Sequence, residues 1–507
     1  MNNERSPAPL LPCSSAPPLP LSASPRLHRR SFLADTGMGF TGLALGALLF
    51  KDGVIRADES DITEGPKSGP HHTPKAKNVI WIFLCGGVSH MESFDVKPEL
   101  NKYAGKSIED SPYKSFLDPE RINKNLVGIN PSHMQRKELM GLQTGFRKYG
   151  QSGLEVGDWF THVGSCADDL AVVRSLWTIH NDHGTQLTWH TGRHPREGAF
   201  PTIGSWISYG LGSLNENLPD YVVLGTPTGD CCGGEWTHGA GYLGPEYAGV
   251  RLDVGAKNPL PFVAPADGGV LPEEQAAEFS LLGRLNTLAG IDYPDDAALR
   301  ARIKSYELAF GMQTAVPETL ELAKETAATQ QLYGLDNGPT QAFGRLCLSA
   351  RRLVERGVRF VQVFHGGGGG GSWDAHSEIK SNHTNLAAQV DKPIAGLLTD
   401  LKRRGMLDET LVVWGTEFGR TPAAQGTGRD HHPQAFCAWL AGGGIKGGVT
   451  HGASDELGFY SVESPHYVTD IHATVLHQLG LDPRRLEVPG RRRLEIDLGR
   501  PIKEIIA

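Results

Sequence analysis

Cysteine is scarce in this sequence, and the few cysteines follow no pattern that predicts a cross-linked scaffold. Only 7 of the 507 residues are cysteine, and none forms a Cys-X-X-Cys pair. This density excludes a small disulfide-rich fold. Cys231 and Cys232 are adjacent, and the sequence assigns them no bridge. Stability must therefore come from an apolar core, which a chain of this length with 39% hydrophobic residues can build.

An excess of positive charge is also absent. The formal net charge is −8 and the isoelectric point is about 6.2. Such a chain has no overall attraction to phosphate backbones, so we expect no nucleic-acid partner. The short basic run Arg491-Arg492-Arg493 is interpreted as a solvated surface patch.

The apolar stretch near the N-terminus, residues 37–50, is shorter than the ~20 residues that a membrane-spanning helix needs. Arg-Arg-Ser-Phe-Leu at residues 29–33 precedes it, which is typical of a twin-arginine export signal. We therefore predict a disordered N-terminus and signal over 1–57, a linker over 58–76, and export to the periplasm or cell envelope. The cleavage site at 55–57 is weak, so a retained signal that tethers the protein to the membrane is the alternative.

Continuous apolar runs after residue 77 predict strands that are buried on both faces of a sheet. Helical patterns separate several of them, and a helix at 341–356, closed by Gly357, leads directly into one run. This order predicts an α/β fold with a mainly parallel central sheet flanked by helices. We expect a single domain over 77–507, with a helical insertion near 296–334 broken at Pro317. The predicted strands are 79–84, 221–224, 358–364, 411–414 and 436–440.

Carboxylates and histidines follow three of these strands. The carboxyl ends of parallel strands meet at one edge of a sheet, where ligands bind. Mixed carboxylate and imidazole ligands suit Zn or Mn better than Ca, so we predict one or two divalent ions there. A flexible solvent loop is the alternative for each motif taken alone. The candidate ligands are Glu92, Asp95, Asp374, His376 and Glu417.

The densest cluster of ligand-type residues is Gly-Arg-Asp-His-His-Pro at 428–433. Adjacent side chains usually diverge, so only one of His431 and His432 is expected to bind an ion. The polar segments 180–185 and 190–195 carry further histidines whose chemistry the sequence leaves open. His472 and His477 lie on an apolar helix face and are interpreted as structural.

Arg420 follows Glu417 closely in the segment Gly-Thr-Glu-Phe-Gly-Arg. The planar guanidinium fork can hold an anionic ester group. A structural pair between Arg420 and Glu417 is the alternative.

Five motifs are spread along the chain: Leu-Cys-Gly-Gly at 84–87, Ser-Phe-Asp-Val-Lys-Pro at 93–98, Trp-Asp-Ala-His at 373–376, Glu-Phe-Gly-Arg at 417–420 and the segment 428–433. Together they resemble the exported domain of unknown function 1501 family, which belongs with sulfatase-like and alkaline-phosphatase-like proteins. The resemblance runs from about residue 77 to 506 and implies an alkaline-phosphatase/sulfatase-like fold. It implies the fold and the location of the site more firmly than a reaction.

The resemblance also implies two metal positions. Asp95 or Glu92 with Glu417 would serve one, and Asp374 and His376 with His431 or His432 the other. The late Asp-His-Gly turn of the superfamily is replaced by Glu-Phe-Gly at 417–419, which removes one histidine ligand.

A second departure concerns the nucleophile. Thr-Gly-Arg at 191–193 is similar to the end of the sulfatase nucleophile segment, and this register puts Asp182 at the nucleophile position. Formylglycine chemistry is therefore not expected. Thr185 activated by the metal, or a metal-bound hydroxide, are the two remaining routes, with Arg193 or Arg420 holding the anion.

The sequence therefore predicts an exported hydrolase that uses a divalent metal on a phosphate or sulfate ester of a small anionic molecule or glycan. The absent nucleophile motivates a second hypothesis, a catalytically silent protein that binds anions or glycans or scaffolds a surface assembly. A phosphomutase-like transfer is a third.

Overall fold

The computed structural model describes residues 69–507 apart from 119, 121–135, 257–258, 261–271 and 293–296. The predicted export signal and the linker as far as residue 68 lie outside the described residues. No helix among the described residues is long and apolar enough to cross a membrane. The chain divides into two compact units. The larger comprises residues 61–268 and 301–507 and holds the sheet, and the other contains helix α8 (Pro272–Asp292).

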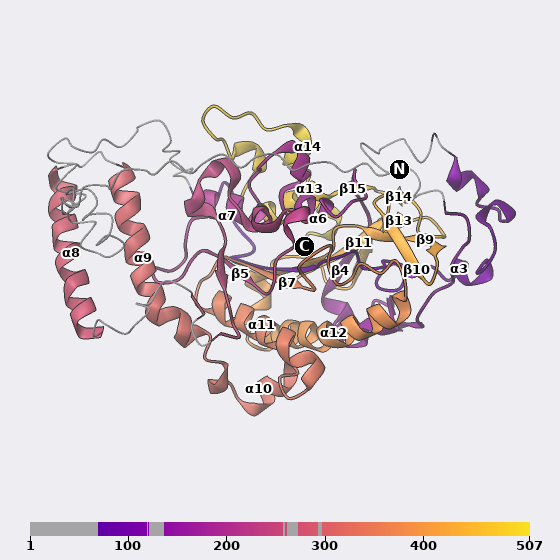
Figure 1. Cartoon of the computed structure of the whole chain (residues 1–507), viewed down its shortest axis with the longest axis horizontal. Coiled ribbons are helices and arrows are strands. Elements are labelled where there is room, and N and C mark those ends of the chain that lie inside the picture. Colours follow the sequence, from indigo (N-terminus) through magenta and orange to yellow (C-terminus); the bar gives the residue numbers. More distant parts are fainter. Residues whose placement is uncertain (1–68, 119, 121–135, 257–258, 261–271, 293–296) are drawn as a thin grey trace, which may run out of the picture. The chain divides into compact units, whose positions relative to one another are not determined.

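A nine-stranded sheet forms the centre of the larger unit (Figure 1). Its order is β12-β4-β11-β8-β1-β7-β5-β6, and β15 also pairs with β4. Every pairing is parallel except those of β11, which runs antiparallel to β4 and to β8. The predicted α/β class with a mainly parallel sheet is therefore confirmed. The strands are β1 (Asn78–Leu84), β4 (Leu170–Trp177), β5 (Tyr221–Leu224), β6 (Val250–Leu252), β7 (Phe360–His365), β8 (Thr410–Gly415), β11 (Phe436–Ala441), β12 (Val449–His451) and β15 (His466–Tyr467).

Strand β1 shows why the sheet strands are apolar throughout. Alternate side chains of a strand point to opposite faces. Ile80 and Ile82 join one buried cluster with residues of α11 and α12, whereas Trp81 and Phe83 join a second cluster with residues of α7 and α13. All four side chains are fully buried. The sheet therefore separates two apolar cores, and a strand side chain on either face packs into one of them. This is why these strands are apolar at every position.

Helices cover both faces of the sheet. Figure 1 shows α11 and α12 on one face, with α6, α7 and α13 toward the other. The helix predicted at 341–356 is α11, which ends before Gly357 in the left-handed region. The helices of the larger unit are α3 (Glu99–Lys102), α5 (Thr161–Gly164), α6 (Thr185–Thr191), α7 (Ile203–Leu211), α9 (Ala297–Thr319, which starts in the other unit), α10 (Ala327–Leu332), α11 (Gly338–Glu355), α12 (Ile379–Arg403), α13 (Val468–Gln478) and α14 (Glu495–Leu498).

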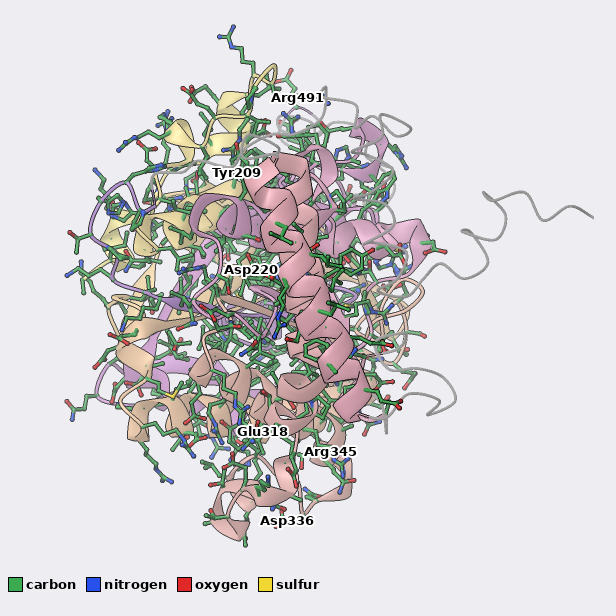
Figure 2. All side chains as sticks on the ribbon, turned by 90° about the vertical axis from the view of Figure 1, so that its left-hand side faces the viewer. Tyr209, Asp220, Glu318, Asp336, Arg345 and Arg491 are labelled. Atoms are coloured by element: carbon green, nitrogen blue, oxygen red, sulfur yellow. The ribbon has the colours of Figure 1, made fainter. Side chains whose placement is uncertain are left out.

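The region near 296–334 is helical, but its helix is not broken at Pro317. Helix α9 continues through Pro317 to Thr319. Proline removes a hydrogen bond from the helical turn that precedes it. Because α9 ends at Thr319, this loss falls close to the end of the helix and does not divide it. Arg356, the residue after α11, donates to the Glu318 carboxylate at 3.0 Å, and Arg352 of α11 donates to the Glu318 carbonyl at 3.1 Å. Glu318, labelled in Figure 2, thus docks the end of α9 on α11.

The direction of the strands explains where the polar loops meet. Strands β4, β1, β7 and β8 are parallel, so the loops that follow them leave the same edge of the sheet. Strand β11 runs the other way, and so it begins at that edge. The ribbon before it, β9 (Gly419–Gln425) with β10 (Gly428–His432), therefore lies over the same edge. Two further ribbons pair β2 (Phe146–Tyr149) with β3 (Leu154–Gly157) and β13 (Ala453–Ser454) with β14 (Ser461–Glu463).

Backbone segments approach one another closely at this edge, and glycine makes the approach possible. A Cβ on Gly86 would lie 2.4 Å from the Asp374 nitrogen, and one on Gly371 would lie 2.4 Å from the Cys85 carbonyl carbon. Both glycines have positive φ, 119° and 102°. The glycine-rich loop after β7 is thus fitted against the end of β1.

We predict that Gly371→Ala destabilises the protein by more than about 1 kcal/mol, because the left-handed backbone and the contact with Cys85 both oppose a side chain. Urea unfolding would measure the change. Gly405→Ala is the matched control, since its φ is also positive but no atom lies within 4 Å of the added Cβ. An equal cost for both variants would contradict the close approach.

Candidate metal centre

Four segments that are distant in the sequence bring imidazoles and carboxylates together at this edge. His183 lies in the turn between β4 and α6, Asp374 and His376 follow the glycine-rich loop after β7, Glu417 follows β8, and His431 lies on β10.

Asp374 is the centre of the cluster. Its Oδ2 lies 3.0 Å from His183 Nε2. Its Oδ1 lies 3.0 Å from His376 Nε2 and 3.1 Å from His431 Nε2, and it accepts a hydrogen bond of 2.9 Å from Arg420. Burial alone would raise the pKa of Asp374, but the three imidazoles and the Arg420 charge hold that pKa far below its usual value. Asp374 is therefore a carboxylate at any physiological pH.

His183 is held between two carboxylates. Its Nδ1 faces Glu417 Oε1 at 3.4 Å, and its Nε2 faces Asp374. Burial lowers the pKa of His183, but hydrogen bonds to Asp374 and Glu417 outweigh burial and raise it to about 9. At neutral pH and without an ion, His183 is thus an imidazolium. Its Nε2 proton is directed at Asp374 Oδ2.

Glu417 orients its neighbours from a fully buried position. Its two oxygens accept from the Gly86 backbone N–H at 2.9 and 3.1 Å, and Oε2 accepts from the Thr416 hydroxyl at 3.0 Å. His183 Nδ1 faces the same carboxylate, so Glu417 would hold the proton on Nδ1 once the Nε2 proton is lost, as a carboxylate behind a metal-binding histidine commonly does.

His431 and His376 complete the cluster. Their Nε2 atoms are 3.0 Å apart, and His431 Nδ1 lies 2.7 Å from the Asn181 carbonyl oxygen. Burial lowers the pKa of His431 to about 4, whereas the hydrogen bond to Asp374 raises that of His376. His376 is also the more exposed of the two, with 34% of its side chain accessible against 7%.

Two overlapping sets of ligand atoms lie within 4.8 Å of one another, His183 with Asp374 and His431, and His376 with Asp430 and His431. Both sets require His431. Its Nδ1 faces Asn181, so a single nitrogen, Nε2, is directed into the cluster. The arrangement therefore suits one ion at a time better than two.

Arg420 lies beside Asp374 but does not face an open space. It is fully buried, and its guanidinium donates to the backbone oxygens of Gly86, Gly87, Trp373 and Arg429 as well as to Asp374. It thus ties the loops after β1 and β7 together, and its fork is not available to an ester in this conformation.

Glu92 and Asp95, both predicted as ligands, are placed outside the cluster. Glu92 pairs with Arg429 at 2.7 Å, and both side chains are fully buried. Asp95 pairs with Lys97 at 2.9 Å and accepts from the Ser454 hydroxyl. Both carboxylates therefore serve as buried ion-pair partners.

The remaining candidates also face other groups. His432 points away from His431, as successive strand residues do, and its Nε2 meets the Phe459 carbonyl at 2.5 Å. The buried Thr185 hydroxyl donates to the His180 carbonyl at 3.2 Å. Arg193 donates to both Asp497 oxygens at 2.6 and 3.0 Å, and to Glu197.

The sequence did not single out His183 or Asp430 as ligands. His183 belongs to the polar segment 180–185, to which the sequence alone assigns no chemistry. The signal was present, because residues 170–173 form an apolar run directly before that segment. Recognising β4 as a sheet strand would have placed His183 at the common edge.

The model of a family described as "Protein of unknown function (DUF1501)" matches residues 76–506. No curated protein matches the sequence. Among solved structures the chain is similar to the PsFucS1 sulfatase of Pseudoalteromonas sp. (13% identity, TM-score 0.32, 90% of this chain and 77% of that one). It is also similar to the lipoteichoic acid synthase LtaP of Listeria monocytogenes (11%, 0.35, 86% and 79%) and the phosphonate monoester hydrolase of Silicibacter pomeroyi (11%, 0.31, 84% and 76%). These similarities are too weak to assign a reaction.

Proposed function

The chain belongs to the DUF1501 family, and from this premise we propose that it hydrolyses phosphate or sulfate esters with one divalent metal ion, Zn or Mn. The observation that carries the proposal is the convergence of His183, Asp374 and His431 at the sheet edge. The outer nitrogens of both histidines already face oxygen atoms, Glu417 and the Asn181 carbonyl. Their Nε2 atoms are therefore directed inward as ligands.

An ion held there would supply Lewis-acid polarisation of the ester and a lowered pKa for an attacking water. Water is the proposed nucleophile because the Thr185 hydroxyl is buried and already donates to His180. Asp182 is likewise engaged, with His194 at 2.7 Å and Arg196 at 3.1 Å.

His376 is the proposed proton donor to the leaving oxygen. It is the most exposed imidazole of the cluster, and the hydrogen bond to Asp374 favours its protonated form. Its Nε2 proton is shared with Asp374 Oδ1 at 3.0 Å in the ion-free protein, and we propose that an ester approaches this imidazole from its exposed side. Arg420 and Glu417 are proposed as positioning residues for Asp374 and His183.

The substrate class remains an anionic small molecule or glycan ester, and the proposed place of action is the periplasm or cell envelope after twin-arginine export. A membrane association would require retention of the signal.

The proposal is tested with chelator-stripped protein reloaded with Zn or Mn and assayed on an aryl phosphate and an aryl sulfate. We expect turnover of one ester that depends on added metal. His376→Gln should lower kcat by about 100-fold or more with little change in KM, as loss of a general acid does. Metal-loaded protein that turns over neither ester would favour the silent binding protein instead.

Metal affinity should depend on pH through His183. The His183 pKa of about 9 in the ion-free protein means that a proton must leave before the ion binds. Below that pKa the dissociation constant should fall by about tenfold for each pH unit as pH rises, and it should level off above it. Zn or Mn titration by calorimetry in buffers from neutral to alkaline pH would measure this. His477→Gln should leave the slope unchanged, and a flat profile for the native protein would contradict the role of His183.

A further inference from the structure

A second pair of histidines lies along β4, and it shares no residue with the candidate metal centre. His451 ends β12 and pairs with Val173, and His466 begins β15 and pairs with Leu176. Both strands pair in parallel with β4, so the sheet fixes both backbones. The ribbon β13–β14 lies between the two histidines in the sequence. The imidazoles are therefore brought together by the fold, not by sequence neighbourhood.

Their geometry resembles two metal ligands. His451 Nε2 lies 2.9 Å from His466 Nε2. His466 Nδ1 lies 2.8 Å from an Asp470 oxygen on α13, which follows β15 directly (Figure 1). The other Asp470 oxygen accepts from the Arg500 backbone N–H at 2.8 Å. With its Nδ1 proton directed at this fixed carboxylate, His466 presents a lone pair at Nε2.

The tautomer of His451 is not fixed in the same way. No residue in the described part of the chain hydrogen-bonds to its Nδ1, and its side chain is partly exposed. The proton can therefore reside on Nδ1, facing water, and leave a second lone pair at Nε2. Burial and His466 lower the pKa of His451, whereas Glu504 and Glu463 raise it. The net effect is a lowered pKa, which favours the neutral imidazole, the form that binds a metal ion.

The two nitrogens are 2.9 Å apart, which is the length of a hydrogen bond between the rings in the ion-free protein and is also compatible with two ligands of one ion. Two nitrogens at ~2.0 Å from one ion lie about 2.9 Å apart at a right angle, and about 3.3 Å apart in a tetrahedral site. The observed 2.9 Å therefore matches adjacent positions of a tetragonal ion, the geometry of Cu(II). Cu(II) is also the divalent ion that imidazole binds most tightly in the first-row series.

We propose that His451 and His466 form a binding site for Cu(II), with Asp470 as the positioning residue that holds the His466 ring. Bound copper would close the chain segment 452–465, which carries β13 and β14, and so stabilise this part of the fold. The site does not depend on the proposed ester hydrolysis.

Electron paramagnetic resonance during Cu(II) titration of the stripped protein tests the proposal. The Asp374→Asn variant is used alongside the native protein, so that copper in the candidate metal centre does not obscure the signal. We expect one tetragonal Cu(II) per chain with coupling to two imidazole nitrogens in the Asp374→Asn variant. Adding His451→Gln or His466→Gln should remove that signal. Glutamine keeps a hydrogen-bonding side chain of similar length. A contact between positions 451 and 466 that has only a structural role would therefore be retained in part, whereas copper binding would be lost.

Two further variants complete the test. Asp470→Asn should weaken copper binding by about 10- to 100-fold, as loss of a carboxylate behind a histidine ligand does. The control is His477→Gln, which should have no effect, because the His477 ring contacts the His72 ring, at 4.6 Å between centroids, and not the proposed site. Thermal unfolding without copper confirms that each variant folds. Copper coordination that persists in both His451→Gln and His466→Gln, or that is absent from the Asp374→Asn parent, would overturn the proposal.

Discussion

Under the proposed function, replacing Asp374 with asparagine is expected to weaken binding of the proposed metal ion by more than about 100-fold and to lower turnover by about 1000-fold or more. Asp374 is the one group that contacts all three imidazoles of the cluster. The variant removes a charged ligand and leaves the His183 proton without its main partner. A loss of several kcal/mol of charge stabilisation corresponds to three or more powers of ten in rate.

Isothermal titration with Zn or Mn, together with the aryl ester assay, measures both effects. Asp336→Asn is the matched control, because Asp336 is an exposed carboxylate, 3.9 Å from Lys392 and labelled in Figure 2. The control should bind the ion and turn over ester as the native protein does. Unchanged ion affinity in Asp374→Asn would contradict the proposed centre.

The second large effect concerns stability. Arg429→Met should destabilise the fold by about 3–5 kcal/mol, because it leaves the fully buried Glu92 carboxylate without its partner at 2.7 Å. Arg429 also donates to four backbone oxygens, of Thr421, Pro422, Met140 and Gly141, which would lose their partner. Urea unfolding at neutral pH measures the free energy.

Two further variants show how much of the destabilisation comes from the unpaired Glu92 charge. Adding Glu92→Gln to Arg429→Met should recover part of the loss, since it removes the orphaned charge. Arg147→Met, which breaks an exposed pair with Asp158, should cost under about 1 kcal/mol. If Glu92 were an ion ligand instead, the cost of Arg429→Met would change when the protein is stripped of metal, and the proposed structural role would fail.

The sheet was largely predictable because its central strands are continuous apolar runs. Strands β1, β5, β7, β8 and β11 all correspond to predicted runs. The edge strands β12 and β15 have only three and two residues, which no periodicity can reveal. The reversed direction of β11 also has no sequence signal. That direction matters, because it brings His431 to the edge where the parallel strands end.

The candidate centre was predictable in part, because its residues come from the segments that follow sheet strands. Glu417 follows β8 directly, whereas Asp374 and His376 lie at the end of a longer loop after β7, whose glycines fit it against the end of β1. Glu92 and Asp95 also follow a strand, but their partners Arg429 and Ser454 come from segments far along the chain. Sequence spacing carries no information about such partners. The buried state of Arg420 likewise depends on carbonyl groups from two separate loops and from strand β10.

The most direct test of the single-ion centre is the metal content of the native protein by mass spectrometry, purified without a metal-affinity resin. Zn and Mn are counted together, beside Asp374→Asn and Glu92→Gln. One such ion per chain in the native protein and in Glu92→Gln, lost in Asp374→Asn, is the result expected from His183, Asp374 and His431 as ligands. Two ions per chain, or an ion that survives Asp374→Asn and is lost in Glu92→Gln, would contradict it.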